Sequence, residues 1–164
     1  MTYLSKAVFL VAALGLSACG GVNQFEETGA NTAAIAGSVD DPTSPAYFQQ
    51  AVGDRVLFEV DQSVLTSSAA TILDGQAQWL MRNSDYSAVI EGHADEQGTR
   101  EYNLALGARR ANAVEEYLIA EGVAPTRLRV VSFGKERPLE ICSAESCYAK
   151  NRRAVTVISV APMS

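Results

Sequence analysis

The sequence predicts an α+β fold, an α/β sandwich in which elements in the order β-α-β-α-β-β form one mixed sheet with helices packed over it. Short runs rich in β-branched and apolar residues alternate with two longer segments whose apolar residues recur at helical spacing. The connection before the last strand is shorter than a crossover helix of about a dozen residues, so this strand is expected to be antiparallel to its neighbours. The pattern covers about 110 residues, which suits one compact domain.

Four strands are expected, each rich in apolar or β-branched residues. They are Arg55–Val60, Tyr86–Glu91, Arg127–Phe133 and Ala154–Val160. The stretch Glu145–Asn151, just before the last strand, is expected to add a short helical turn.

Two long helices are expected between these strands. The first is capped by Ser67 or Ser68 and continues to about Arg82, with apolar residues at helical spacing. Thr99 is a typical N-cap for the second and longest helix, and Gly122 is a typical residue to end it.

The N-terminus has the pattern of a secretory signal peptide. Lys6 precedes an apolar run from Ala7 to Leu16, roughly half the ~20 residues that a membrane-spanning helix needs. The run ends in Leu-Ser-Ala-Cys19, which resembles the lipobox of bacterial lipoproteins. The resemblance implies a lipoprotein signal peptide over residues 1–18 and acyl chains on Cys19. The alternative is an ordinary signal peptide that happens to contain a cysteine.

The lipobox resemblance also implies a location. Gly20 stands where an Asp favours the inner membrane, so the expected place is the outer membrane, with the domain facing the periplasm. Gly, Ala, Asn, Thr, Ser and acidic residues predominate up to Gln50, a composition typical of flexible segments. Residues 19–50 are therefore expected to be the lipidated Cys19 and a flexible tether, and residues 51–164 the domain.

The charge balance argues against nucleic acid as a partner. The chain has 13 basic and 19 acidic residues, a net charge of −6, and removal of residues 1–18 deletes Lys6 and no acid. A protein that binds a nucleic-acid backbone needs a clustered basic surface. Here the basic residues are interspersed with acids, apart from the pairs Arg109-Arg110 and Arg152-Arg153.

The three cysteines fit an exported protein. With Cys19 carrying lipid, Cys142 and Cys147 remain as the possible pair in an oxidising compartment. We therefore expect a local disulfide. The alternative is half of a metal site, but a structural zinc site needs more ligands than one Cys pair supplies, and the sequence offers no second cluster.

The most informative stretch runs from Glu91 to Val114 and includes Gly-His-Ala-Asp-Glu-Gln-Gly at residues 92–98. It closely resembles the OmpA-like peptidoglycan-binding domain family. Three other segments match in order: Val56–Asp61, Val131–Pro138 and Asn151–Val155. The resemblance spans about residues 52–160 and implies the family's mixed-sheet fold.

Spacing along the longest helix separates two adjacent arginines. At ~100° per residue the apolar residues form one stripe. The stripe consists of Leu104, Gly107, Ala111, Val114 and Leu118. Arg110 falls at its edge, where a side chain can line a groove, whereas Arg109 points to solvent. Asp95 precedes the helix near its positive N-terminal end. Spacing alone fits equally well a purely structural interpretation, in which Asp95 complements the helix dipole and Arg110 pairs with a surface acid.

The resemblance implies a site that binds diaminopimelate in the stem peptide of peptidoglycan. Asp95 would take its ammonium, and Arg110 its carboxylate, which a guanidinium can grip through two parallel hydrogen bonds. Asp61, Asn103 and Leu106 are implied as further groove residues. Similarity to the lipid-anchored members of the family implies TolB and other Tol-system proteins as partners, in envelope integrity and cell division.

No catalytic residue, metal or cofactor is expected. His93 could be a metal ligand or general base, but it is the single histidine and belongs to no metalloprotease motif. Asp95 and Glu96 are neighbours on a short loop, unlike glycosidase carboxylates that stand ~5 to 9 Å apart across a sugar. The alternatives to a non-catalytic tether are a periplasmic peptidoglycan hydrolase and an adhesion or chaperone-like domain that reuses the fold.

Overall fold

The computed structural model describes residues 37–160. The expected signal peptide, Cys19 and the first part of the expected tether lie outside these residues. Within residues 37–160, no helix combines the length and the apolar character needed to cross a membrane.

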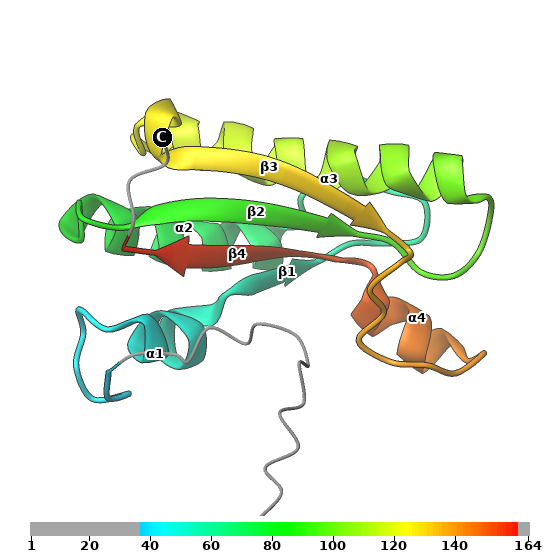
Figure 1. Ribbon diagram of the computed structural model, residues 1–164, viewed down its shortest axis with the longest axis horizontal. Coiled ribbons are helices and arrows are strands. Elements are labelled where there is room, and N and C mark those ends of the chain that lie inside the picture. The colour runs from blue at the N-terminus through cyan, green and yellow to red at the C-terminus, as the bar shows by residue number, and fades with distance from the viewer. Residues whose placement is uncertain (1–36, 161–164) are drawn as a thin grey trace, which may run out of the picture. The chain divides into compact units, whose positions relative to one another are not determined.

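The described chain has the predicted α+β class and the predicted order of its main elements (Figure 1). The strands are β1 Arg55–Leu57, β2 Ser87–His93, β3 Leu128–Gly134 and β4 Arg153–Ser159. The α-helices are α1 Pro45–Tyr47, α2 Ser67–Arg82, α3 Arg100–Ala120 and α4 Glu145–Asn151. The π-helical segment η1 Phe48–Gly53 follows α1, and the 3-10 turn η2 Pro125–Arg127 precedes β3.

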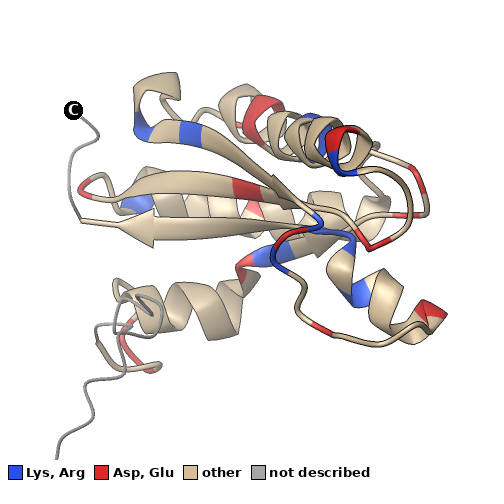
Figure 2. Ribbon diagram, turned by 45° about the vertical axis from the view of Figure 1, so that its right-hand side comes forward, with Lys and Arg blue, Asp and Glu red and all other residues tan. Residues whose placement is uncertain are grey.

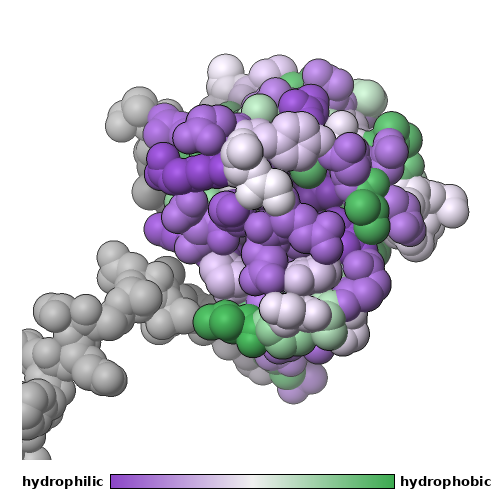
Figure 3. Space-filling model, turned by 90° about the vertical axis from the view of Figure 1, so that its right-hand side faces the viewer, coloured by the Kyte–Doolittle hydropathy of each residue, from purple (hydrophilic) through white to green (hydrophobic). Residues whose placement is uncertain are grey.

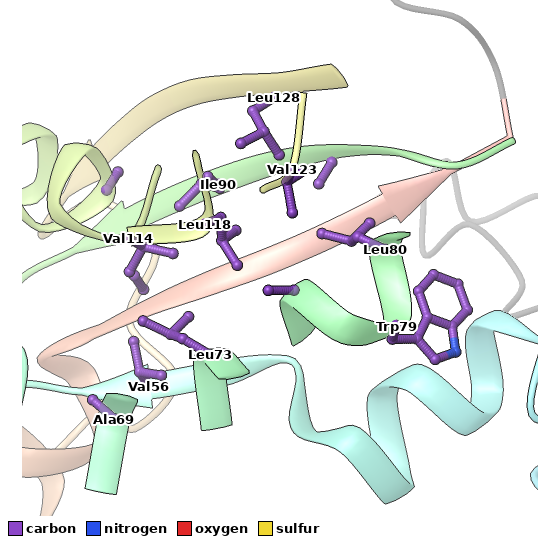
Figure 4. Packing of buried hydrophobic residues seen from close by; sticks show 14 of the residues in the cluster. Val56, Ala69, Leu73, Trp79, Leu80, Ile90, Val114, Leu118, Val123 and Leu128 are labelled. Atoms are coloured by element: carbon purple, nitrogen blue, oxygen red, sulfur yellow. The ribbon is translucent and has the colours of Figure 1, made fainter. Parts of the chain in front are cut away.

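The four strands form one mixed sheet in the order β1-β4-β2-β3. β2 and β3 are parallel, whereas β4 is antiparallel to both β1 and β2, as predicted from its short connection. The core lies between the sheet and the helices α2 and α3, where Leu73, Ile90 and Leu118 are fully buried (Figure 4).

The register of β4 brings three chain segments to one end of the sheet. Leu57, at the end of β1, pairs with Arg153 at the start of β4. Gly92, near the end of β2, pairs with Ala154. The residues that follow β1, those that follow β2 and those that precede β4 therefore meet at the same place.

The first helices differ from the prediction, because part of the expected tether belongs to the folded domain. Ser44 caps α1 by accepting a hydrogen bond from the N–H of Tyr47. Phe48 is buried, with its ring centroid 4.9 Å from that of Trp79. The indole N–H of Trp79 donates to the Pro42 carbonyl at 2.7 Å. Burial of Phe48 and Trp79 fixes this segment despite its polar composition.

The ends of three other elements can be compared with the predictions from local sequence. Thr99 caps α3 by accepting from the N–H of Tyr102, and Gly122 follows α3 with φ +106°, both as predicted. The cap of α2 is Thr66, which accepts from the N–H of Ala69, so the prediction of Ser67 or Ser68 was wrong. β1 ends three residues before the predicted Val60, because the chain turns there.

Buried His93 closes β2. Both ring nitrogens lack a hydrogen-bond partner among the described residues, and the ring stacks on Phe133 at 5.6 Å between centroids. Glu91 lies 3.6 Å from Nε2, too far for a hydrogen bond. Burial lowers the pKa of His93; Glu91 opposes this shift, whereas Arg153 and Arg137 add to it.

Gly92 and Gly107 let α3 approach β2 closely, and we predict that Gly92→Ala destabilises the protein. A Cβ atom at Gly92 would lie 1.8 Å from the Gly107 carbonyl oxygen, so the helix would have to move. The free energy of unfolding, measured in denaturant, should fall by about 1–3 kcal/mol or more. Gly75→Ala is the control, because its Cβ would make an ordinary 3.4 Å contact with Val52 and alanine favours the helix. Unchanged stability of Gly92→Ala would contradict this packing.

A second prediction concerns how the stability of the protein depends on pH. His93 has a lowered pKa in the folded state, so below an unfolded pKa of ~6.5 the unfolded chain binds more protons and stability falls as the pH falls. His93→Phe keeps an aromatic ring and does not titrate. Its free energy of unfolding should therefore decrease less than that of the unchanged protein between about pH 7.5 and pH 5. Identical pH profiles of the two proteins would refute the burial argument.

Candidate ligand-binding site

A cavity of about 220 Å³ opens at the end of the sheet where the three segments meet. We call it the Asp95 cavity. It is lined by Val60, Asp61, Asp95, Gln97, Gly98, Tyr102, Asn103 and Leu106. Four of these, namely Asp61, Asp95, Asn103 and Leu106, were predicted as site residues. Val60, which was not among the predicted site residues, is exposed.

Arg110, the fifth predicted residue, lies behind the cavity and is fully buried. The prediction that it sits between core and solvent was therefore wrong. All three of its bonds go to main-chain carbonyls: Nε donates to that of Gln62 at 2.8 Å, Nη1 to that of His93 at 2.8 Å and Nη2 to that of Glu59 at 3.2 Å. These three bonds tie the turn after β1 to the end of β2. Burial lowers the pKa of Arg110 to about 10, with Asp95 opposing the shift, so the side chain remains charged at neutral pH.

The buried face of α3 differs from the predicted apolar stripe, which explains why Arg110 was placed wrongly. It includes Asn103, Leu106 and Arg110, whereas Leu104, which belonged to the predicted apolar stripe, is 44% exposed. The segments that follow β1 and β2 cover the first half of α3 and bury polar residues there. Arg109 is exposed, as predicted.

Arg152 is a second buried guanidinium at this site, and sequence reasoning did not single it out. Its Nη1 lies 3.2 Å from Asp95 Oδ2, its Nη2 pairs with Glu145, and its Nε donates to the Phe58 carbonyl at 3.2 Å. Arg152 thus joins the segment after β1, the segment after β2 and the start of α4. The sequence had offered two signals, the Arg152-Arg153 pair and the resemblance of Asn151–Val155 to the family.

Asp95 is held within a tight loop, residues 95–98, which forms one wall of the cavity. Its Oδ1 accepts from the N–H of Gln97 at 3.1 Å. The side chain of buried Asn103 donates to the Gln97 carbonyl at 2.8 Å, and Lys135 Nζ donates to the Gly98 carbonyl at 2.7 Å. The carboxylate therefore has a fixed position before any ligand arrives.

Asp61 lies across the cavity in an uncommon backbone conformation. Its φ of +57° is in the left-handed region, where few residues other than glycine are found. The Tyr102 hydroxyl donates to the Asp61 carboxylate, and this bond raises the pKa of Tyr102. Tyr102 was missed by sequence reasoning, because helical spacing alone does not show that it reaches back to the turn after β1.

The two arginines behind the cavity are compensated differently. Among the described residues, Arg152 pairs with the buried carboxylate of Asp95 and with Glu145, whereas Arg110 is buried without an ion pair. Asp61, which lines the cavity, and Glu145, which does not, are both exposed. Acidic and basic residues alternate over the loops here (Figure 2), and the surface of this end is mainly hydrophilic (Figure 3). Arg110 therefore places a positive charge behind the cavity, which favours an anionic ligand group.

The predicted disulfide is confirmed. Cys142 and Cys147 are joined, with Cα atoms 6.0 Å apart, in the segment that leads into α4. Among the described residues, no group of three or more His, Cys, Asp or Glu side chains is arranged to hold a metal ion.

Comparison with known proteins agrees with this architecture. The OmpA family model matches residues 57–152. The peptidoglycan-associated lipoprotein of Mesorhizobium japonicum is 46% identical over 155 residues, which cover 93% of this chain and 90% of that protein. The peptidoglycan-associated lipoprotein of Pseudomonas aeruginosa is 45% identical over 141 residues, which cover 86% of this chain and 80% of that protein.

Solved structures show the same fold. The crystal structure of the peptidoglycan-associated lipoprotein from Burkholderia pseudomallei aligns with a TM-score of 0.66 at 36% identity, covering 74% of this chain and 98% of that one. The C-terminal domain of Helicobacter pylori MotB aligns with a TM-score of 0.61 at 22% identity, covering 65% of this chain and 84% of that one. This likeness is one of fold alone. The chain belongs to the OmpA family and is a homologue of the peptidoglycan-associated lipoproteins.

Proposed function

We propose that this chain is an outer-membrane lipoprotein that binds peptidoglycan non-covalently and so connects the outer membrane to the cell wall. The main observation behind this proposal is that one cavity is lined by four predicted site residues from three separate segments. They are Asp61, Asp95, Asn103 and Leu106. Membership of the OmpA family and homology to proteins named for association with peptidoglycan support the same function.

The ligand proposed for the Asp95 cavity is the diaminopimelate residue of the stem peptide. Its free end carries an ammonium and a carboxylate, which need one anion and one cation at a fixed separation. The Asp95 carboxylate, with about four lone-pair sites, accepts from Gln97 and Arg152. Acceptor capacity therefore remains for an ammonium.

The carboxylate of diaminopimelate is proposed to face the buried arginines. Arg110 has five N–H groups, and three main-chain bonds are assigned to them. Arg110 is therefore proposed to have two roles: it holds the turn after β1 in place, and it provides a buried positive charge behind the cavity. Arg152 already pairs with Asp95 and Glu145, whereas Arg110 forms no ion pair among the described residues. Arg110 is therefore the cation that a ligand carboxylate would neutralise.

A hydrolase that acts on the same polymer is the alternative, and the placement of Glu96 argues against it. Glu96 Oε1 accepts from the Tyr148 hydroxyl at 2.8 Å. It lines a different cavity, beside Lys135, Ile141 and Asn151. Asp95 and Glu96 therefore do not face a common bond, as the acid and base of a glycosidase must.

Two further parts of the proposal rest on the sequence. Acyl chains on Cys19 are proposed to anchor the chain, since more than one acyl chain holds a protein stably in a bilayer. TolB and other Tol-system proteins are proposed as partners, in envelope integrity and cell division.

The test is co-sedimentation of the protein with purified sacculi. Asp95→Asn removes the charge while keeping the shape, and we expect it to lower the bound fraction at least about tenfold, because a charge-assisted hydrogen bond is lost. Arg110→Lys should also weaken binding, since lysine cannot reproduce three directed bonds. Arg109→Ala is the matched control, because Arg109 is exposed on the same helix, and it should bind normally.

Two outcomes would contradict the proposal. Equal loss of binding in all three variants, with normal circular dichroism, would show that the Asp95 cavity is not the site. Steady release of soluble fragments from the sacculi by the unchanged protein would show that it is a hydrolase.

A further inference from the structure

The disulfide loop, residues 142–147, contacts the wall of the Asp95 cavity although it is distant in sequence. The Ser143 hydroxyl donates to Glu96 Oε1 at 3.4 Å, and Tyr148, next to Cys147, donates to the same oxygen at 2.8 Å. The bond to Glu96 raises the pKa of Tyr148. Glu96 is part of the 95–98 loop that carries Asp95, so these contacts hold that loop from the side opposite the cavity.

The same segment reaches Asp95 by a second route. Glu145, inside the disulfide loop, pairs with Arg152, and Arg152 pairs with Asp95 at 3.2 Å. Two paths therefore lead from the disulfide loop to the 95–98 loop, one through Tyr148 and Glu96 and one through Glu145 and Arg152.

The disulfide is a covalent restraint on the start of this segment, whose side chains Ser143 and Glu145 otherwise make one hydrogen bond and one ion pair. Residues 142–146 are exposed, and within the described chain no side chain caps the first turn of α4. A helix of this length is not stable by itself. The end of α4 is fixed independently, because buried Asn151 accepts from the N–H groups of Leu139 and Glu140 at 2.8 and 3.0 Å. Opening the disulfide would therefore loosen the start of α4 and leave its end in place.

We propose that the Cys142–Cys147 disulfide sets the ligand affinity of the Asp95 cavity, with Tyr148 and Glu145 as the positioning residues through which it acts. The proposal rests on the proposed function for its ligand. It adds that the affinity depends on the redox state of a bond outside the cavity.

The test compares oxidised and reduced full chain for binding of a soluble stem tripeptide that contains diaminopimelate. A dithiol reduces the bond: two electrons and two protons pass to the sulfurs, the S–S bond breaks, two thiols form and the dithiol closes into its own disulfide. We expect about fivefold weaker binding after reduction, the order expected when one or two positioning hydrogen bonds are lost. Reoxidation should restore the affinity.

Variants separate positioning from general stability. The double variant C142S/C147S should bind like the reduced protein and be insensitive to the dithiol. Tyr148→Phe should weaken binding of the oxidised protein and reduce the further effect of the dithiol, because both act on Glu96. Glu140→Gln is the matched control: it removes a 3.0 Å ion pair with Lys150 in the same segment, and we expect its affinity and its redox response to be unchanged.

A ligand-free measurement completes the test. The amide N–H of Gln97 donates to Asp95, so its chemical shift should move on reduction and return on reoxidation. Unchanged affinity and an unchanged Gln97 shift after reduction would overturn this proposal while leaving the proposed function intact. Loss of affinity only in proportion to unfolded protein would overturn it too. Absence of binding by the oxidised protein would instead refute the proposed function, and with it this proposal.

Discussion

The site depends on two buried guanidinium groups that bind main-chain carbonyls. Taking a charge out of water costs several kcal/mol unless hydrogen bonds and opposite charges compensate. Arg110 obtains this compensation from the carbonyls of Glu59, Gln62 and His93, and Arg152 obtains it from Phe58 and two carboxylates. The segments after β1 and β2 therefore need a defined conformation, and together they form most of the wall of the Asp95 cavity.

The sheet places these arginines where they are needed. β4 lies between β1 and β2, so Arg152, the residue just before it, stands between the ends of both. α3 approaches β2 at Gly92 and Gly107, which sets Arg110 behind the cavity. A preorganised carboxylate in front of the buried positive charge of Arg110 suits a zwitterionic group, and the disulfide loop contacts the loop that carries this carboxylate. The cavity and its proposed ligand chemistry thus follow from one arrangement of charge.

The sequence was sufficient for features that depend on local rules and fixed spacing. The order of the main elements, the antiparallel last strand, the Thr99 cap and the disulfide were predicted, and so were four residues that line the cavity. Tertiary contacts decided the rest. Arg110 was placed at the edge of the core because a helical wheel does not show that loops will cover it. The roles of Arg152 and Tyr102 come from pairing across the sheet end, and that of Phe48 from a tryptophan far along the chain.

The most direct measurement is amide chemical-shift mapping of the full chain during titration with a stem tripeptide. The diaminopimelate tripeptide should give saturable changes that are largest at Gln97, Gly98 and Asn103, around the Asp95 cavity. A tripeptide with lysine, which lacks the side-chain carboxylate, should bind far more weakly. Changes centred instead on the apolar groove formed by Leu57, Ile72 and Leu139, or equal binding of the two tripeptides, would contradict the account.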